Sequence, residues 1–205
     1  MTFNTEAFAG FPVSRETMVS LKRYAKLLTE ESGRQNLIAK STLDGLWQRH
    51  IADSAQLAQF APNGESSWID IGSGAGLPGI VLACIVKGRV TLVEPRRLRA
   101  EFLERVVTDL GLDRATVIGA KAQNVVGQFG VITARAVGSV DALLQMTIHL
   151  SHPGTVWVLP KGRRAKSELA DARRSWHCDA TSKGSLTDPE SEVLVLRNVR
   201  PKGRG

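Results

Sequence analysis

The sequence predicts an α/β fold, in which a mostly parallel, doubly wound sheet carries an N-terminal helical extension. Residues 1–63 show helical periodicity, whereas short β-like runs alternate with helical segments from residue 64 onward. This alternation is typical of right-handed βαβ units, whose helices cover both faces of a parallel sheet. A glycine-rich segment directly after the first β-like run is a further indication, because open parallel sheets bind ligands at the carboxyl ends of their strands. We therefore expect a helical extension over 1–63 and a ligand-binding domain over 64–205.

The first helix of the extension is expected to begin after Ser14, a residue type that caps helices, with Val13 and Met18 at the positions of a hydrophobic staple. A second helix is expected to start at Ser41, with Asp44 three residues later. Residues 61–64, Ala-Pro-Asn-Gly, then interrupt the helical pattern. The apolar faces of the two helices comprise Met18, Leu21, Tyr24, Ala25 and Leu28 in the first and Leu43, Leu46, Trp47 and Ile51 in the second.

The domain that follows is expected to alternate strands with helices. The strands are Trp68–Ile71, Val90–Val93, Thr116–Ile118, Val131–Thr133, Thr155–Leu159 and Val193–Leu196. The helices are Leu77–Val86, Arg97–Leu110, Ala122–Gln128, Val140–Leu150 and Lys166–Ser175.

Composition narrows the class of protein. The 205 residues are 42% hydrophobic and 23% charged, which excludes collagen, a disordered chain and a disulfide scaffold. The longest strictly apolar run, residues 80–86, is far short of the ~18–20 residues that span a bilayer. The N-terminus has no basic stretch ahead of an apolar core, as a signal peptide would. We therefore expect a cytoplasmic protein without a membrane segment, in which Cys84 and Cys178 stay reduced.

The net charge of +7 favours a polyanionic partner. Residues 161–205 alone hold 11 Lys+Arg against six Asp+Glu, so the basic character is concentrated at the C-terminal end. Such residues can bind RNA phosphates without reading sequence, and a solvated surface is the alternative. The cluster after the fifth expected strand comprises Lys161, Arg163, Arg164 and Lys166, and the last comprises Arg197, Arg200, Lys202 and Arg204.

The glycine-rich segment, residues 70–79, reads Asp-Ile-Gly-Ser-Gly-Ala-Gly-Leu-Pro-Gly. Glycines in such a loop permit positive φ and allow a ligand to approach the backbone closely. Gly74, Gly76 and Gly79 match the spacing of a dinucleotide-binding fingerprint, with Glu94 at the position of a ribose-binding acid. On this interpretation the protein would be an NAD(P)-dependent oxidoreductase.

The same loop also reads Asp70-x-Gly72-x-Gly74-x-Gly76, which resembles the motif of class I S-adenosylmethionine-dependent methyltransferases with a Rossmann-like fold. We favour S-adenosylmethionine as the cofactor, because Asp70 would repel a pyrophosphate but can help to hold a cationic methionyl group. Glu94 ends the second expected strand, where its carboxylate can accept hydrogen bonds from both ribose hydroxyls. A salt bridge with Arg96, Arg97 or Arg99 is the alternative role for Glu94.

Missing motifs narrow the atom that could be methylated. Methylation of an exocyclic base amine usually goes with Asn/Asp-Pro-Pro-Tyr/Phe after the fourth strand, where residues 131–137 read Val-Ile-Thr-Ala-Arg-Ala-Val. Methylation of pyrimidine C5 needs a thiolate, usually in a Pro-Cys pair, and neither cysteine follows a proline. His149 and His152 are joined by no Cys or carboxylate cluster, so we expect no metal site.

Guanine N7 fits what remains, because it has an exposed lone pair and loses no proton on methylation. No general base is then required, and catalysis reduces to in-line positioning of the two reactants. Arg135 follows the fourth expected strand, at the edge where the ligand loop lies, and it is the candidate catalytic residue as a donor to O6 or to the Watson–Crick edge. An ion pair at the end of the sheet is the alternative role for Arg135.

Five motifs resemble those of the glucose-inhibited division protein B family, the bacterial 16S ribosomal RNA guanine-N7 methyltransferases. The resemblance covers nearly the whole chain. The Gly-Leu-Pro-Gly end of the glycine-rich loop and the upstream Arg-His-x-x-Asp-Ser are specific, because generic methyltransferases lack both. The motifs are Asn36-Leu37-Ile38, residues 49–54 (Arg-His-Ile-Ala-Asp-Ser), residues 69–79, residues 133–136 (Thr-Ala-Arg-Ala) and residues 159–162 (Leu-Pro-Lys-Gly).

The resemblance implies methyl transfer from S-adenosylmethionine to N7 of one guanosine in the decoding-region loop of the small-subunit RNA. It implies that Ala122 and Gln123 hold the adenine edge of the cofactor. Residues 121–123 read Lys-Ala-Gln where the family usually has Arg-Ala-Glu, so a charge is lost at Gln123, which can still accept from and donate to adenine. The expected cofactor-binding residues are Asp70, Gly72, Gly74, Gly76, Leu77, Glu94, Ala122, Gln123 and Arg135.

The family resemblance also draws attention to Arg49, His50 and Asp53. Their i, i+3 and i, i+4 spacing would let all three converge on one face of a helix. They could cap the cofactor pocket or touch RNA, but we favour an internal network that docks the N-terminal helices onto the α/β core. The expected protein is a monomer that acts on 16S rRNA or the small ribosomal subunit. A ribosome-assembly factor that binds RNA without catalysis is the remaining alternative.

Overall fold

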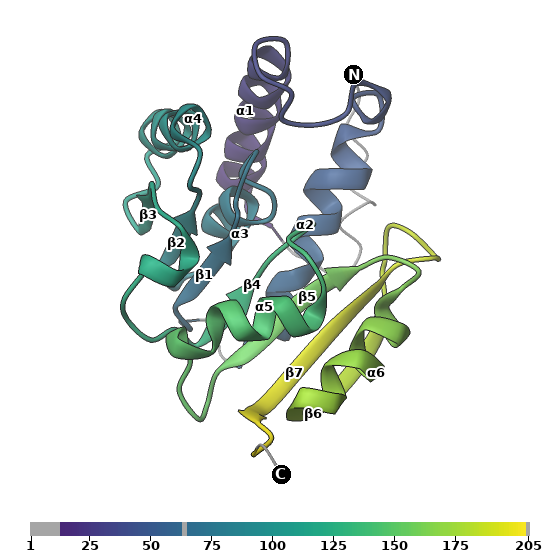
Figure 1. Ribbon diagram of the computed structural model, residues 1–205. Helices are drawn as coiled ribbons and strands as arrows, with labels where there is room; N and C mark the ends of the chain where they lie inside the picture. The colour runs from purple at the N-terminus through teal and green to yellow at the C-terminus, as the bar shows by residue number, and fades with distance from the viewer. Residues whose placement is uncertain (1–12, 63–64, 204–205) are drawn as a thin grey trace.

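The structure is a computed structural model that describes residues 13–62 and 65–203. Its centre is a seven-stranded sheet with the order β3-β2-β1-β4-β5-β7-β6 (Figure 1). Neighbouring strands from β3 to β5 pair in parallel, whereas β7 runs antiparallel to both of its neighbours. The predicted α/β fold with a mostly parallel, Rossmann-like sheet is therefore confirmed.

The observed strands match the expected ones closely on one side of the sheet and less closely on the other. The expected bounds of β1, β2 and β4 are the observed ones, while β6 was not expected. Its residues, Trp-His-Cys-Asp-Ala-Thr-Ser-Lys-Gly, have little apolar alternation because β6 is an edge strand and mostly exposed. The strands are β1 (Trp68–Ile71), β2 (Val90–Val93), β3 (Ala115–Ile118), β4 (Val131–Thr133), β5 (Val156–Lys161), β6 (Trp176–Gly184) and β7 (Glu192–Pro201).

Four of the expected helices of the domain form, and one does not. The helix expected over 122–128 is only a short 3-10 turn, Ala122–Asn124. The chain turns extended at Val125, and Gly127 adopts a φ of +122°, which no helix allows. The α-helices are α1 (Arg15–Ser32), α2 (Asp53–Ala55), α3 (Gly79–Ile85), α4 (Arg97–Asp109), α5 (Val140–Thr147) and α6 (Ala165–Ser175).

The N-terminal extension is helical, but its second helix begins later than expected. Ser14 caps α1 as predicted, because its Oγ accepts the Thr17 N–H at 3.1 Å. The start expected at Ser41 is wrong: residues 40–42 form a 3-10 turn, in which Thr42 Oγ1 donates to the Ala39 carbonyl at 2.8 Å. The helical segment begins at Trp47, with π-helical residues Trp47–Ala52 followed by α2 and by a 3-10 turn over Gln56–Phe60.

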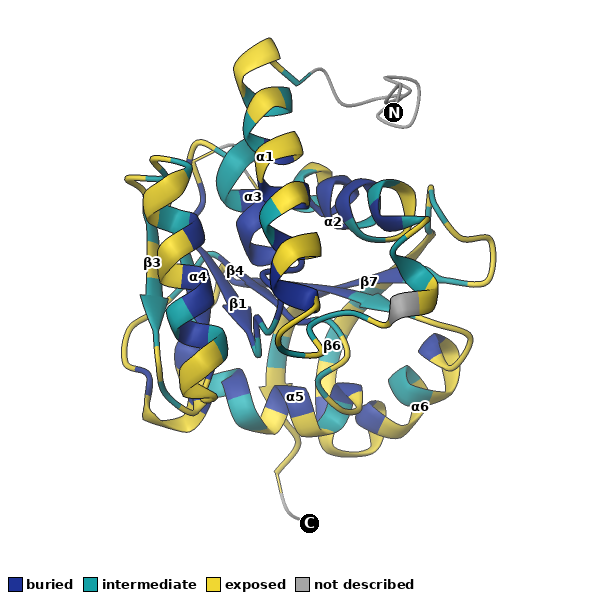
Figure 2. Ribbon diagram, turned by 90° about the horizontal axis from the view of Figure 1, so that it is seen from above, coloured by how far each residue is buried: buried dark blue, intermediate teal, exposed yellow. Residues whose placement is uncertain are grey.

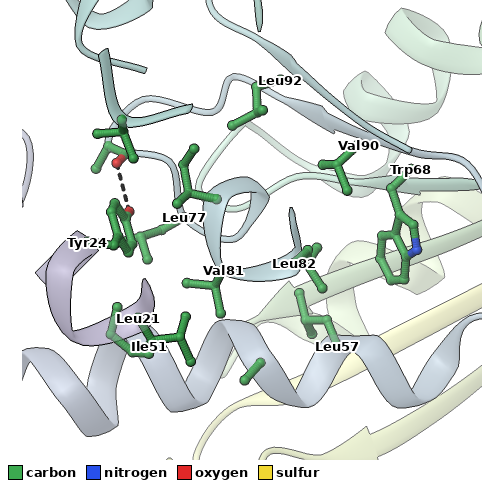
Figure 3. Close-up of a cluster of buried hydrophobic side chains, with 14 of the residues drawn as sticks. Leu21, Tyr24, Ile51, Leu57, Trp68, Leu77, Val81, Leu82, Val90 and Leu92 are labelled. Atoms are coloured by element: carbon green, nitrogen blue, oxygen red, sulfur yellow. Dashed lines mark hydrogen bonds between the residues drawn. The ribbon is translucent and has the colours of Figure 1, made fainter. Parts of the chain in front are cut away.

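Alternating side chains of the strands pack against a different helical layer on each face of the sheet. Trp68 of β1 packs in the cluster that includes residues of α1, α3 and α4, and Ile69 packs in the cluster that includes residues of α5 and α6. Figure 2 shows the buried strands between these two layers. Leu21, Tyr24, Ile51 and Leu57 of the N-terminal extension belong to the first cluster (Figure 3), so these helices complete the core on that face. The boundary predicted at 63–64 lies outside the described residues.

Three expected absences concern the described residues only. There, no helix combines the length and apolar character needed to cross a bilayer. The same residues hold no group of three or more His, Cys, Asp or Glu side chains able to ligate a metal. Cys84 and Cys178 are free thiols on opposite faces of the sheet, and burial raises the pKa of the Cys84 thiol to about 12.

Candidate active site

The glycine-rich loop leaves β1 at the carboxyl ends of the parallel strands and leads into α3. Gly72, Gly74 and Gly76 have φ values of +67°, +52° and +93°, the left-handed region in which side chains are strained. A Cβ on Gly76 would also lie 2.6 Å from Ile80 Cγ1. Ser73 ties the loop to the sheet, because its N–H donates to the Val93 carbonyl and its Oγ to the Asp70 carbonyl, each at 3.0 Å. The local sequence is thus what the tight turn requires.

Tyr24 of α1 supports this loop from below. Its fully buried hydroxyl donates a hydrogen bond of 2.8 Å to the Ala75 carbonyl, the dashed line in Figure 3. Burial raises the pKa of Tyr24 well above its ordinary value, so the hydroxyl keeps its proton. Sequence reasoning placed Tyr24 only in the core. The available signal was a tyrosine on an apolar stripe, since a buried tyrosine hydroxyl usually needs a partner.

Asp70 lies beneath the loop and is almost fully buried. Its Oδ2 accepts the Gly79 N–H at 3.0 Å and so caps the start of α3, whereas its buried Oδ1 has no hydrogen-bond partner within residues 13–62 and 65–203. Burial raises the pKa of this carboxyl to about 7. An unpaired buried acceptor is costly, and it fits the donor group of a ligand such as an ammonium.

Glu94 joins the loop to the end of β2. Its Oε2 accepts the Gly74 N–H and its Oε1 accepts the Arg96 N–H, both at 2.9 Å. The contact with Arg96 is therefore to the backbone, and the Arg97 guanidinium pairs with Glu101 instead, at 2.6 Å. Because each carboxylate oxygen has a second lone pair, Glu94 can still accept from ligand hydroxyls.

The other predicted cofactor residues differ in which of their atoms a ligand could contact. The Leu77 side chain is buried in the core cluster, so a ligand could touch only its backbone. Ala122 is buried and Gln123 is exposed, in the 3-10 turn shortly after β3, the strand that pairs with β2. These two residues thus follow the strand next to β2, whose end carries Glu94.

Arg135 lies in the loop after β4, where it meets the N-terminal extension. Its Nη1 lies 3.1 Å from His50 Nδ1 and 3.7 Å from Asp53 Oδ2. Because a guanidinium can only donate, His50 Nδ1 must accept, and the Nε2–H is left to face Thr42 Oγ1 at 3.0 Å. Burial, together with the nearby Arg135 and Arg49, lowers the pKa of His50 to about 4, so the imidazole is neutral.

The internal docking network that we favoured for the Arg-His-x-x-Asp motif is confirmed for His50 and Asp53. Arg49 is exposed and takes no ion pair within the described part of the chain, but it lies close enough to His50 to help lower the pKa of that imidazole. Its stem passes over Gly45, where a Cβ would lie 3.1 Å from Arg49 Cδ. A second guanidinium beside Arg135 would also be repelled.

Asp53 connects the same network to the segment between β6 and β7. Its Oδ1 accepts from Thr187 Oγ1 and from Gln56 Nε2, each at 2.8 Å. Gln56 Oε1 in turn accepts the Leu186 N–H at 2.9 Å. Sequence reasoning missed this segment, because no motif links residues 185–187 to residues more than 120 positions earlier.

A cavity of about 710 Å³ opens beside Arg135 at the carboxyl ends of β4 and β5. Its lining mixes both signs of charge, and it includes Asp53, Ser139, Lys161, Arg164 and Glu192. The volume is within the ~300–1,000 Å³ of small-molecule sites. The cavity can therefore accommodate a group the size of a nucleotide next to Arg135.

The first predicted RNA-binding cluster is only partly available to a ligand. Lys161 has a side chain that is 11% exposed, pairs with Glu168 at 2.9 Å and donates to the Gly138 carbonyl at 2.8 Å, so it is a half-buried cation whose charge is already paired. Arg163 pairs with Glu190, and Lys166 lies 3.6 Å from Glu192, but all three of Arg163, Arg164 and Lys166 are exposed. Arg164 has no ion pair with any described residue.

The second predicted cluster lies at the other end of the sheet. Leu196 of β7 pairs with Trp157 near the start of β5, while Glu192 pairs with Lys161 at its end. Arg197 and Arg200 continue β7 beyond Leu196, so they are exposed at the amino ends of the parallel strands, away from the glycine-rich loop. The structure therefore does not bring the two basic clusters together. Arg204 lies outside the described residues.

Comparison with known proteins identifies the family. The family model for GidB, rRNA small subunit methyltransferase G, matches residues 17–193. The ribosomal RNA small subunit methyltransferase G of Zymomonas mobilis is 43% identical over 199 residues, covering 93% of this chain and 90% of its own. The protein of that name from Rhizorhabdus wittichii is 44% identical over 197 residues, covering 94% and 91%.

Solved structures agree on the fold alone. A SAM-dependent methyltransferase from Aquifex aeolicus superposes with a TM-score of 0.60 at 13% identity, covering 74% of this chain and 91% of that chain. A methyltransferase from Geobacter sulfurreducens has a TM-score of 0.56 at 14% identity, with coverage of 92% and 91%. These matches lend no support to an oxidoreductase or to a non-catalytic assembly factor. The chain belongs to the rRNA small subunit methyltransferase G family of S-adenosylmethionine-dependent enzymes.

Proposed function

We propose that this protein transfers the methyl group of S-adenosylmethionine to N7 of a guanosine in the RNA of the small ribosomal subunit. The observation that carries the proposal is the buried, unpaired Oδ1 of Asp70 beneath a loop with three glycines at positive φ. That combination would provide an acceptor for a cationic amine next to glycine backbone, which has no Cβ to obstruct a ligand. When bound, the cofactor supplies an electrophilic methyl group on its sulfonium.

Five sets of atoms would hold the cofactor. Asp70 Oδ1 would accept from its ammonium group, and the free lone pairs of Glu94 would accept from its ribose hydroxyls. The glycine-rich loop, the Leu77 backbone and residues 122–123 would form the remaining walls. The Tyr24 hydroxyl and the Glu94 carboxylate already hold the loop at Ala75 and Gly74 without a ligand, so the site is preorganised.

The acceptor base needs positioning rather than deprotonation, since guanine N7 carries a free lone pair. Only one Arg135 nitrogen, Nη1, contacts His50 and Asp53. A guanidinium has five N–H donors, so others remain to bind O6 of the guanine while N7 stays free. Holding the base in line with the methyl group supplies the proximity effect, worth several kcal/mol in well-oriented systems.

The RNA would approach over the cavity beside Arg135. Arg163, Arg164 and Lys166 are exposed on its side of the sheet and could bind phosphates. Arg197 and Arg200 would reach a separate part of the RNA, because they lie at the opposite end of the sheet. We also propose that the protein acts as a monomer in the cytoplasm, where ribosomal subunits are assembled.

The test is methylation of small subunits from a strain without the gene, using methyl-labelled S-adenosylmethionine and the purified protein. Reductive cleavage at N7-methylguanosine, followed by primer extension, maps the product. We expect one strong stop in 16S rRNA, and none with a Gly74→Trp variant, whose side chain would fill the loop. Labelling at another base atom, or no labelling by the folded wild type, would refute the proposal.

A further inference from the structure

His50 occupies an unusual position for a residue of the N-terminal extension. It comes from the π-helical segment before α2, yet its ring contacts Arg135 in the loop after β4 and Thr42 in the preceding 3-10 turn. The Arg135 side chain is 22% exposed and lines the cavity. A long side chain at such a place has many rotamers, and fixing it requires partners.

The two ring nitrogens of His50 face groups with different requirements. Nδ1 faces Arg135 Nη1, which can only donate, and Nε2 faces Thr42 Oγ1, which can accept. Only a neutral ring with its proton on Nε2 satisfies both contacts. An imidazolium would place an N–H against the guanidinium, with two positive charges about 3 Å apart. The charged groups that act on the ring are Arg135 and Arg49, and Asp53 pairs with Arg135.

Asp53 is the second partner of the same Arg135 nitrogen. Its Oδ2 is 3.7 Å from Arg135 Nη1, and its Oδ1 is held by Thr187 and Gln56. Arg135 Nη1 thus lies between a neutral acceptor and a carboxylate, both of which are fixed by further hydrogen bonds. Among the described residues no other guanidinium nitrogen of Arg135 has a hydrogen bond or ion pair, and the residue lines the cavity.

From this geometry we infer that His50 is a positioning residue, whose neutral Nε2–H imidazole fixes the Arg135 guanidinium toward the acceptor base. The inference rests on the proposed function, since it concerns the orientation of Arg135 during methyl transfer. It gives the N-terminal extension a part in the reaction, because the sheet domain alone lacks this acceptor.

Two substitutions separate the two contacts of the ring. In His50→Asn the amide oxygen lies near the position of Nδ1 and can accept from Arg135, but the contact with Thr42 is lost. In His50→Gln the amide nitrogen reaches the position of Nε2 and can donate to Thr42, but the acceptor for Arg135 is lost. If His50 only docked the extension, both variants would behave alike or Gln would be the better replacement.

We expect His50→Gln to lower kcat on the order of 10- to 100-fold, the worth of a hydrogen bond to a charged group. His50→Asn should stay within about 3-fold of the wild type, and the KM for S-adenosylmethionine should change little in both. In an Arg135→Ala background His50→Gln should have no further effect, because residues that act through one another are not additive. Equal losses in the two variants, or a full additional loss in that background, would overturn the inference.

A spectroscopic measurement tests the tautomer without relying on activity. The chain has four histidines, and ¹⁵N-labelled His50 is identified as the signal missing from His50→Asn. We expect a neutral ring protonated at Nε2 at pH 6; an imidazolium or an Nδ1–H ring there would overturn the inference. If wild-type protein does not methylate RNA at all, the proposed function fails, whereas active wild type with an indifferent His50→Gln refutes only the positioning role.

Discussion

Replacement of Tyr24 by phenylalanine removes one hydroxyl that joins the N-terminal extension to the glycine-rich loop. The hydroxyl donates to the Ala75 carbonyl at 2.8 Å, and Tyr24 has no exposed surface, so water cannot take over. Within the described residues the Ala75 carbonyl receives no other hydrogen bond. Leaving a buried acceptor unsatisfied costs about 1–3 kcal/mol. For a chain of this size that corresponds to a decrease in Tm of roughly 2–12 °C.

Loss of the Tyr24 hydrogen bond should weaken cofactor binding as well as lower the overall stability. Ala75 lies between Gly74 and Gly76, whose backbone a ligand would approach, so a carbonyl freed from Tyr24 can reorient the loop. If the whole cost fell on the binding-competent loop, affinity for the cofactor would drop about 5- to 150-fold. We expect a value inside this range, because part of the cost is shared by the unbound protein.

The measurement combines thermal unfolding with calorimetric titration of S-adenosylhomocysteine. Leu28→Val is the matched control, because Leu28 is also fully buried on α1 and the change removes one methylene, worth about 1 kcal/mol. The control should lower Tm by a similar amount and leave the Kd unchanged. Equal Kd values for wild type and Tyr24→Phe, or equal weakening in both variants, would refute the role of Tyr24 in holding the loop.

Three further predictions address other parts of the molecule. Gly76→Ala should lower the free energy of unfolding more than Gly111→Ala does, as measured by urea unfolding. Both substitutions add roughly 1 kcal/mol of backbone strain at positive φ. At Gly76 the new Cβ would also lie 2.6 Å from a neighbouring atom, whereas at Gly111 no atom lies within 4 Å. Burial raises the pKa of Asp70 to about 7 from an ordinary value near 3.8. As the pH rises, the carboxyl therefore loses its proton in the unfolded chain before it does so in the folded protein. The free energy of unfolding of the ligand-free protein should decline as the pH rises from 3.8 to about 7. Asp70→Asn should remove this decline in thermal melts across that range. Lys161→Met should destabilise the fold by about 1–3 kcal/mol, because it leaves the half-buried Glu168 without its ion pair. Arg164→Ala should leave Tm unchanged and reduce the salt dependence of RNA binding by about one phosphate contact. Equal effects of these last two variants on RNA binding would contradict the distinction between a cation already paired within the protein and an exposed cation.

The parts of the fold that the sequence predicted well are those in which local pattern and burial coincide. The strands β1, β2 and β4 are short apolar runs that are buried on both faces, and their bounds were predicted without error. The edge strand β6 forms because β7 offers it a partner, and its own residues do not indicate this. The segment after Ala122 has helical composition, yet it turns extended where it packs beneath α5.

The residues of the candidate site also differ in whether the sequence alone could identify them. The glycine-rich loop, Asp70 and Glu94 could be identified from residues close together in the sequence, because a tight turn at a strand end has strict backbone requirements. Sequence by itself thus determined the fold class, the glycine-rich loop after β1 and the family motifs. Only the tertiary structure decided that Lys161 is paired with Glu168, that Arg197 and Arg200 lie at the far end of the sheet, and that His50 faces Arg135. Each of these depends on contacts between segments distant in the sequence, whose packing sets burial and direction, and no local pattern encodes them.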